Sequence, residues 1–250
     1  PNIDVNIEDT KYIDSYECLI KYTPLLKAIE SKNIEIIQLL LSNTKIDVNC
    51  KFVRTLKNEL IIEKTPLYSS MILSDNQIFS CLLSYPNIDV NAIITKRTIG
   101  NKIISKRTVL YEAVRKRNSE RVALLLSNPN IDVNIKTINT EDTCKYHSEK
   151  TALYWAVKDK NIEIVKLLLT NPNIDVNFES IKTIHDDLFI SKKSILYEAV
   201  EKENCDIIKL LLEIPNINAN FKSLRICRFA QIGFRKSEKT ILYRLDAMVF

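Results

Sequence analysis

The sequence predicts an all-α repeat solenoid, in which helix-turn-helix units stack along the chain and β-hairpins or long loops project from their side. Two observations lead to this prediction. The pentapeptide Asn-Ile-Asp-Val-Asn recurs along the chain, and so does a tripeptide of Thr or Ser, any residue and Leu. Because both markers keep one period over 250 residues, the period belongs to the architecture.

The pentapeptide marks the end of each unit. Its central position steps by 43, 42, 43, 43 and 43 residues, through Asp4, Asp47, Asp89, Asp132, Asp175 and Asn218. The tripeptide begins at Thr23, Thr65, Thr108, Thr151, Ser194 and Thr240. We therefore predict five repeats at 23–64, 65–107, 108–150, 151–193 and 194–239. A hairpin end at 1–22 precedes them and the start of an incomplete repeat at 240–250 follows, as expected of a piece of a longer polypeptide.

The fourth repeat shows the predicted helices most clearly. Thr151 is a suitable N-cap for a helix that runs from Ala152 to about Asp159. A polar turn separates it from a second helix, Ile162 to Thr170, which Asn171-Pro172-Asn173 ends. The second helix is apolar over so wide an arc that it needs cover on two sides. A single unit cannot provide this cover, whereas neighbouring units can.

The units resemble the ankyrin repeat, and the resemblance covers essentially the whole chain. Its motifs follow in the order Thr-Pro-Leu-x-x-Ala, Asn-Ile-Glu-Ile-Val-Lys-Leu-Leu-Leu and Asp-Val-Asn. The family's period is about 33 residues, so each unit here carries about ten more. The histidine of the family's Thr-Pro-Leu-His is replaced by tyrosine in five units and by Leu26 in the first, which removes the family's threonine–histidine hydrogen bond. The family's loop glycines are also absent.

The additional residues lie between the pentapeptide and the next tripeptide. The resemblance implies that these connections form β-hairpins, which with the first helices of the repeats line a concave binding surface. Residues 92–107 support hairpins directly, since two β-prone runs flank Gly100-Asn101, a dipeptide typical of tight turns. We expect the hairpins to keep their edges unpaired and to contact a partner; elongated surface loops without a partner are the alternative.

Charge is concentrated in two segments. Residues 96–121 hold nine basic and two acidic side chains, and residues 222–239 hold six basic and one acidic, within a chain of net charge +5. Such segments favour an acidic partner or an anionic surface. The alternative is an ordinary solvated surface rich in lysine.

Trp155 is the only tryptophan, and equivalent positions of other repeats hold Lys27, Ser69, Glu112 and Glu198. Tryptophan is frequent at the centres of interfaces, although packing against the repeat also explains it. The predicted partner-binding residues, which lie in the third hairpin and at or near this helix position, are Lys96, Arg97, Lys102, Lys106, Arg107, Glu112, Arg115, Trp155 and Glu198.

No catalytic, cofactor-binding or metal-binding site is predicted. Gly100 and Gly233 are the only glycines, which excludes glycine-rich phosphate loops from this sequence. Cys144 and His147 have the spacing of two metal ligands but lack a second pair. His185-Asp186-Asp187 offers acid–base groups without a nucleophile motif.

The leading hypothesis is therefore a non-catalytic scaffold or adaptor that binds other proteins through the hairpin tips and the concave helix surface. The first alternative is binding of nucleic acid or an anionic surface through 96–121 and 222–239; nucleic acid is less favoured because aromatic residues do not alternate with the basic ones in the third hairpin. The second is regulation of a catalytic domain elsewhere in a longer polypeptide. Six dispersed cysteines, no glycosylation sequon and no run of about 18 apolar residues predict an intracellular, cytoplasmic protein without a membrane span.

Overall fold

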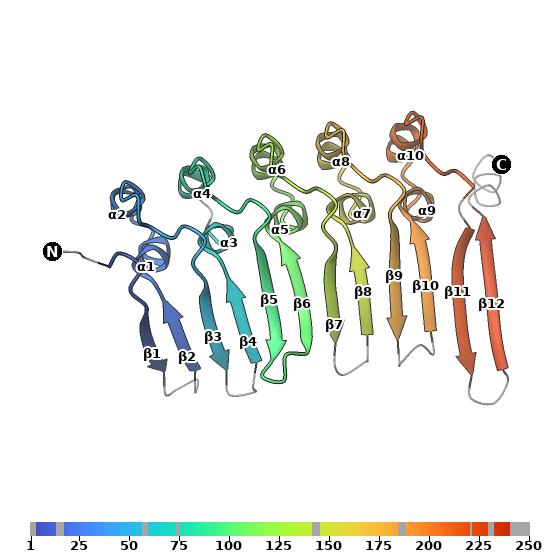
Figure 1. Cartoon of the computed structure of the whole chain (residues 1–250). Helices are drawn as coiled ribbons and strands as arrows, with labels where there is room; N and C mark the ends of the chain where they lie inside the picture. Colours follow the sequence, from blue (N-terminus) through green and yellow to red (C-terminus); the bar gives the residue numbers. More distant parts are fainter. Residues whose placement is uncertain are drawn as a thin grey trace. The chain divides into compact units, whose positions relative to one another are not determined.

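The structure is a computed structural model that describes residues 4–13, 18–56, 60–73, 76–141, 146–184, 189–220, 222–229 and 233–240 (Figure 1). The chain forms two compact units. The first contains Pro1–Glu112 with Ser127–Ile131, and the second contains Ala113–Leu126 with Asp132–Phe250. Each is described by itself. The predicted incomplete repeat at 240–250 lies outside the described residues, except for its first residue.

Each repeat supplies two short helices. The first helices are α1 (Pro24–Ser31), α3 (Pro66–Ser70), α5 (Val109–Arg115), α7 (Ala152–Lys158) and α9 (Ile195–Glu201). The second helices are α2 (Ile34–Leu41), α4 (Asn76–Leu83), α6 (Ser119–Leu126), α8 (Ile162–Leu169) and α10 (Cys205–Leu212). In the fourth repeat, both helices begin at the predicted residues and end one residue before the predicted ones.

The connections between repeats form antiparallel hairpins. In the first unit these are β1 (Asp9–Ile13) with β2 (Cys18–Tyr22), β3 (Phe52–Leu56) with β4 (Leu60–Lys64), and β5 (Ile93–Thr98) with β6 (Ile103–Thr108). In the second unit these are β7 (Thr137–Glu141) with β8 (Tyr146–Lys150), β9 (Glu179–Ile184) with β10 (Phe189–Ser194), and β11 (Lys222–Phe229) with β12 (Gly233–Thr240).

Neighbouring hairpins also pair with one another, so the expectation of unpaired edges is wrong. In the first unit β2 pairs with β3 and β4 with β5; in the second, β8 pairs with β9 and β10 with β11. Each unit therefore carries a continuous antiparallel sheet beside its first helices (Figure 1). The pairing satisfies backbone groups that separate hairpins would leave open to solvent.

Side chains of the repeated tripeptide cap the first helices. The hydroxyls of Thr65, Thr108, Thr151 and Ser194 each accept a hydrogen bond from the backbone N–H three residues later, over 3.0–3.3 Å. That N–H belongs in every case to the tyrosine that replaces the family's histidine, so the cap depends on backbone geometry alone. Asparagine side chains cap second helices in the same way, at Asn33, Asn118, Asn161 and Asn204.

The last asparagine of the pentapeptide joins one repeat to the next. Asn134 Nδ2 donates to the carbonyl of Asn173 at 2.7 Å, and its Oδ1 accepts from the N–H of Asp175 at 2.8 Å. In the first unit, Asn49 makes the same two bonds with Asn87 and Asp89, each 2.8 Å long. We call this pair of bonds the asparagine clip, and it explains why the pentapeptide returns with so little change.

The core of each unit forms between repeats. In the second unit α7 packs against α9, and α8 packs against both α6 and α10. This confirms the prediction that the apolar second helix of the fourth repeat is covered on two sides, and Ile164, Val165 and Leu168 are completely buried. Among the described residues, no helix has the length and apolar character to cross a bilayer.

The two helices of most repeats are joined through a residue in the left-handed conformation. Lys32, Arg117, Lys160 and Glu203 have φ between 54° and 58°. Each stands nine positions after the capping residue, where the repeat has no glycine. Non-glycine residues adopt this conformation at a cost of about 1 kcal/mol, so the repeats tolerate a local strain here.

Candidate functional site

The junction between hairpin and first helix is where the repeats differ most. Two positions meet there: the residue immediately before the N-cap, at the end of a strand, and the residue four positions after the cap, in the first helix. We call them the cap-flanking pair. Because the strand leads directly into the helix, the two side chains come together from adjacent elements.

The chemistry of the cap-flanking pair changes from repeat to repeat. In the third repeat Arg107 forms an ion pair with Glu112 at 3.2 Å, and in the fifth Lys193 pairs with Glu198 at 3.7 Å. In the first, Lys27 Nζ instead lies 5.5 Å from the centre of the Tyr22 ring.

The second and fourth repeats lack the carboxylate. In the second repeat the two positions hold Lys64 and Ser69, and the Lys64 ammonium lies 4.4 Å from the centre of the Phe52 ring. Lys150 lies 5.1 Å from the centre of the Trp155 ring. Cation–π contacts stabilise an ammonium group without neutralising its charge.

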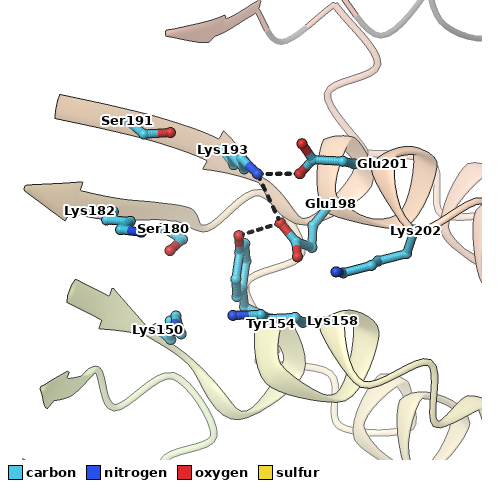
Figure 2. Close-up of a pocket in the computed structure, with 10 residues that line it drawn as sticks. All are labelled: Lys150, Tyr154, Lys158, Ser180, Lys182, Ser191, Lys193, Glu198, Glu201 and Lys202. Carbon is cyan, nitrogen blue, oxygen red and sulfur yellow. Dashed lines mark hydrogen bonds and ion pairs between the residues drawn. The ribbon is translucent and has the colours of Figure 1, made fainter. Parts of the chain in front are cut away.

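A pocket of about 460 Å³ opens at this junction in the second unit (Figure 2). Its walls come from β8, β9 and β10 and from α7 and α9. Five lysines line it: Lys150, Lys158, Lys182, Lys193 and Lys202. The only carboxylates in the lining are those of Glu198 and Glu201, so its formal charge is +3.

Both carboxylates are engaged within the wall of the pocket. Tyr154 donates its hydroxyl hydrogen to Glu198 Oε2 at 2.7 Å, and Lys193 pairs with Glu198 and with Glu201, as the dashed lines in Figure 2 show. Glu198 is only 3% exposed. Burial and the charge of Glu198 raise the pKa of Tyr154, so this hydroxyl remains a donor at every physiological pH.

Most of the remaining ammonium groups have no such neutralisation. Among the described residues, Lys150, Lys158 and Lys202 form no ion pair with a carboxylate. Lys158 lies 5.3 Å from the centre of the Trp155 ring, near Lys150. Burial, followed by the positive charge of Lys158, lowers the pKa of Lys150 to about 8. The pocket therefore holds positive charge that an anion could stabilise.

The predicted binding residues of the third hairpin lie in the first unit, where internal contacts engage some of them. Arg97 Nη2 lies 2.6 Å from Glu63 Oε1, and its Nη1 donates to Asn101 Oδ1. Glu112, which pairs with Arg107, is only 3% exposed. Lys96 and Lys106 are half-buried and Lys102 is exposed, so these three present their charge most directly.

The second unit contains the other predicted residues. Glu198 lines the pocket of Figure 2, and Trp155 contacts two of its lysines, Lys150 and Lys158; of the two residues only Trp155 is partly exposed. Arg115 is exposed on α5. Arg121 of the basic segment 96–121 is 2% exposed, so counting it as surface charge was wrong. Of the basic segment 222–239, the strands are described but the side chains of its basic residues lie outside the described residues.

The residues considered for metal or acid–base chemistry are only partly described. Cys144 and His185-Asp186-Asp187 lie outside the described residues. His147 Nε2 lies 3.5 Å from Glu149 Oε1. Among the residues with described positions, no three side chains of the metal-binding types come together.

Sequence reasoning identified the helix position of the cap-flanking pair but missed its strand position. A signal was available, because the third and fifth repeats place opposite charges five residues apart around the cap, at Arg107 and Glu112 and at Lys193 and Glu198. The pocket itself had no such signal, since its lysines come from β8, α7, β9, β10 and the turn after α9, which only the fold brings together.

Comparison with known proteins gives the family. The family model for ankyrin repeats in three copies matches residues 93–180 and 137–223, and the single ankyrin repeat model matches residues 21–50. No curated protein matches the chain. The ankyrin repeat domain of Bcl-3, a member of the IκB family, is similar in structure with a TM-score of 0.52 and 20% identity over 79% of this chain and 73% of that one.

The ankyrin repeat protein EF0377 is similar to the same degree, with a TM-score of 0.52 and 22% identity over 80% of this chain and 84% of its own. At these identities the two structures show the fold alone. The family models, however, match more than half of the sequence, including the repeats that form the pocket. The chain therefore belongs to the ankyrin repeat family.

Proposed function

We propose that this chain is a non-catalytic scaffold or adaptor that binds partner proteins through the face formed by its hairpins and first helices. Ankyrin repeats generally mediate protein–protein interaction, which gives the class of function. The proposal adds the surface, and the variation of the cap-flanking pair is the observation that carries it.

A constant frame with a variable face is what a binding scaffold requires. The N-caps and the asparagine clips recur in both units with nearly the same distances. The cap-flanking pair alternates between ion pairs and cation–π contacts on that frame. If the pair served packing alone, the same two residue types could recur in every repeat, whereas recognition of a particular partner requires residues that differ along the face.

The test compares partner capture from the native cell by the wild-type chain and by two variants. Trp155→Glu changes the junction of the second unit, and a double charge reversal, Lys96→Glu with Lys106→Glu, changes the third hairpin. We expect each to reduce captured partner several-fold while circular dichroism and the thermal midpoint remain close to those of the wild type.

Lys166→Glu provides the matched control. Lys166 is exposed on α8, a second helix away from the hairpins, and its replacement reverses one lysine charge, as each of the two substitutions of the hairpin variant does. Partner capture that falls equally in the control, or stays unchanged in all variants, contradicts the proposed surface. A large loss of thermal stability in Trp155→Glu would instead assign Trp155 to packing.

The alternative of nucleic-acid binding through the basic segments loses support from the contacts of residues 96–121. Arg97 and Arg107 are neutralised by Glu63 and Glu112, and Arg121 is buried. Fewer charges are then available to phosphates than the sequence count indicates. Binding to nucleic acid would fall steeply between low and moderate salt, which separates it from the proposed protein interface.

A further inference from the structure

We propose that the pocket at the junction of α7, α9 and the strands β8, β9 and β10 binds a phosphate monoester carried on a side chain of a partner protein. The inference rests on the proposed function and deepens it, since it assigns a chemistry to one part of the binding face. It follows from the charge of the pocket, the type of its cations, its size and the substitution of Trp155 at the cap-flanking position.

The charge of the pocket calls for an anion of more than one charge. Three of its five lysines form no ion pair with a carboxylate among the described residues, and both carboxylates of the lining are engaged by Lys193. A phosphate monoester carries about −1.5 to −2 charges at pH 7 and three acceptor oxygens, whereas a single carboxylate carries one charge. The phosphate dianion therefore matches the excess positive charge of the pocket more closely than a carboxylate does.

The type of cation also favours phosphate. The lining contains lysines and no arginine. Arginine offers a planar, two-bond geometry that fits carboxylate and phosphate alike, whereas lysine acts as a point charge that is a common ligand of phosphate. Ser180 donates its hydroxyl hydrogen to the carbonyl of Glu149 at 2.9 Å, so the ammonium groups and the Ser191 hydroxyl are the donors of the lining that could serve the ligand.

The size of the pocket fits a phosphorylated side chain. Its volume of about 460 Å³ lies within the 300–1,000 Å³ that is usual for sites of small ligands. A free inorganic phosphate would fill only part of it. The remaining space would accommodate the side chain that bears the phosphate.

Trp155 does not line the pocket, but its ring contacts two of the pocket's lysines without neutralising them. In the third and fifth repeats the equivalent position is a glutamate that neutralises the preceding cation. In the fourth, the indole ring holds the ammonium groups of Lys150 and Lys158 at 5.1 and 5.3 Å without cancelling their charge. The substitution converts a closed ion pair into a site with affinity for an external anion.

The proposal predicts a defined dependence on pH. Lys158, Lys182 and Glu198 face Lys150 from α7, β9 and α9, and Lys150 loses its proton as the pH rises through about 8. The phosphate group loses its second charge below a pH of about 6. Binding should therefore be strongest between about pH 6 and 8, and it should take up protons at pH 8 because the anion stabilises the charged form of Lys150.

The test measures binding of four probes to the whole chain by isothermal titration calorimetry. The probes are a short peptide with one phosphoserine, the same peptide with glutamate in its place, adenosine monophosphate and inorganic phosphate. We expect the phosphopeptide to bind at least tenfold more tightly than each of the others. Repeating the titration at pH 8 in buffers of different ionisation enthalpy measures the uptake of protons.

Lys150→Gln and Lys182→Gln are each expected to weaken binding of the phosphopeptide about tenfold, as loss of one charge-assisted hydrogen bond does. Lys150→Gln should also remove the fall in affinity above pH 8. The control Lys166→Gln removes an exposed lysine on α8, outside the pocket, and should leave the affinity within a factor of two. Circular dichroism verifies that each variant is folded.

Three results would overturn the proposal. Equal binding of the glutamate peptide would assign the pocket to carboxylates, equal binding of adenosine monophosphate or inorganic phosphate would assign it to small anions, and no binding of any probe at millimolar concentration would leave the pocket without this role. None of them contradicts the wider protein-binding face. That face is tested separately by partner capture with the third-hairpin variant, which lies outside the pocket.

Discussion

The third and fourth repeats share a frame and differ in the contact that flanks the cap. Thr108 and Thr151 both cap their first helices by accepting from a tyrosine N–H, at 3.0 and 3.3 Å. The difference is the residue four positions after the cap. Glu112 neutralises Arg107 in the third repeat, whereas the Trp155 ring leaves the charge of Lys150 in place in the fourth.

This difference shows that the cap-flanking pair can vary while the frame of the repeat stays the same. Caps, clips and buried helix faces use backbone groups and apolar contacts that do not depend on the cap-flanking pair. A change at that pair therefore alters the charge of this face while the caps and clips stay in place, although a buried member of the pair such as Glu198 also contributes to stability. In the fourth repeat the substitution leaves Lys150, which lines the pocket of Figure 2, without a carboxylate at this position.

The largest effect is expected from breaking the neutral arrangement in the fifth repeat. Glu198→Ala removes a buried carboxylate that accepts from Tyr154 and pairs with Lys193. The buried tyrosine hydroxyl then loses its acceptor, so we expect the free energy of unfolding to fall by about 3 kcal/mol. Urea denaturation followed by circular dichroism measures the change.

Two variants sharpen this measurement. Glu198→Gln keeps an acceptor for Tyr154 but loses the charge, and it should lose only about 1 kcal/mol. Glu163 is exposed in the first turn of α8, and Glu163→Ala should lose about 0.5 kcal/mol or less. A loss for Glu198→Ala no larger than that for Glu163→Ala would show that the buried carboxylate does not hold the junction.

Removing an asparagine clip is expected to cause a smaller loss of stability, similar in the two units. Asn49→Ala in the first unit and Asn134→Ala in the second each remove one asparagine clip, with bonds of 2.7–2.8 Å. Because these bonds are exposed to solvent, we expect each variant to lose about 1 kcal/mol, measured by urea denaturation. Losses that differ strongly between the two units would contradict the idea of a common frame.

Periodicity revealed the frame because the same residues make the same capping and clipping contacts in each repeat. A threonine that caps a helix, or an asparagine that clips two repeats, must occupy a fixed position, so its spacing in the sequence predicts it. The hairpin at 92–107 was predicted for the same reason, since Gly100-Asn101 encodes its turn and Asn101 has a φ of 62°.

The pocket and the sheet could not be predicted in this way. Pairing of β8 with β9 joins two hairpins about 30 residues apart, and no turn residue encodes it. The net charge of a segment was also a poor guide, because Arg121 is buried and Arg97 finds Glu63 on another hairpin. A charged side chain can contribute to an anion-binding site only where the fold leaves it without a neutralising partner.

The smallest effect concerns the turns between helices, where the third and fourth repeats differ again. Arg117 and Lys160 both adopt the left-handed conformation, but Arg117 Nε forms an ion pair with Asp159 at 2.7 Å whereas Lys160 forms none among the described residues. Lys160→Gly should therefore relieve strain and raise the free energy of unfolding by about 0.5 kcal/mol, after the greater freedom of glycine in the unfolded chain is counted. Arg117→Gly relieves the same strain but loses the ion pair, so its gain should be close to zero. Thermal denaturation of the two variants tests this order, and an equal rise in both midpoints would show that the exposed pair adds nothing to the turn.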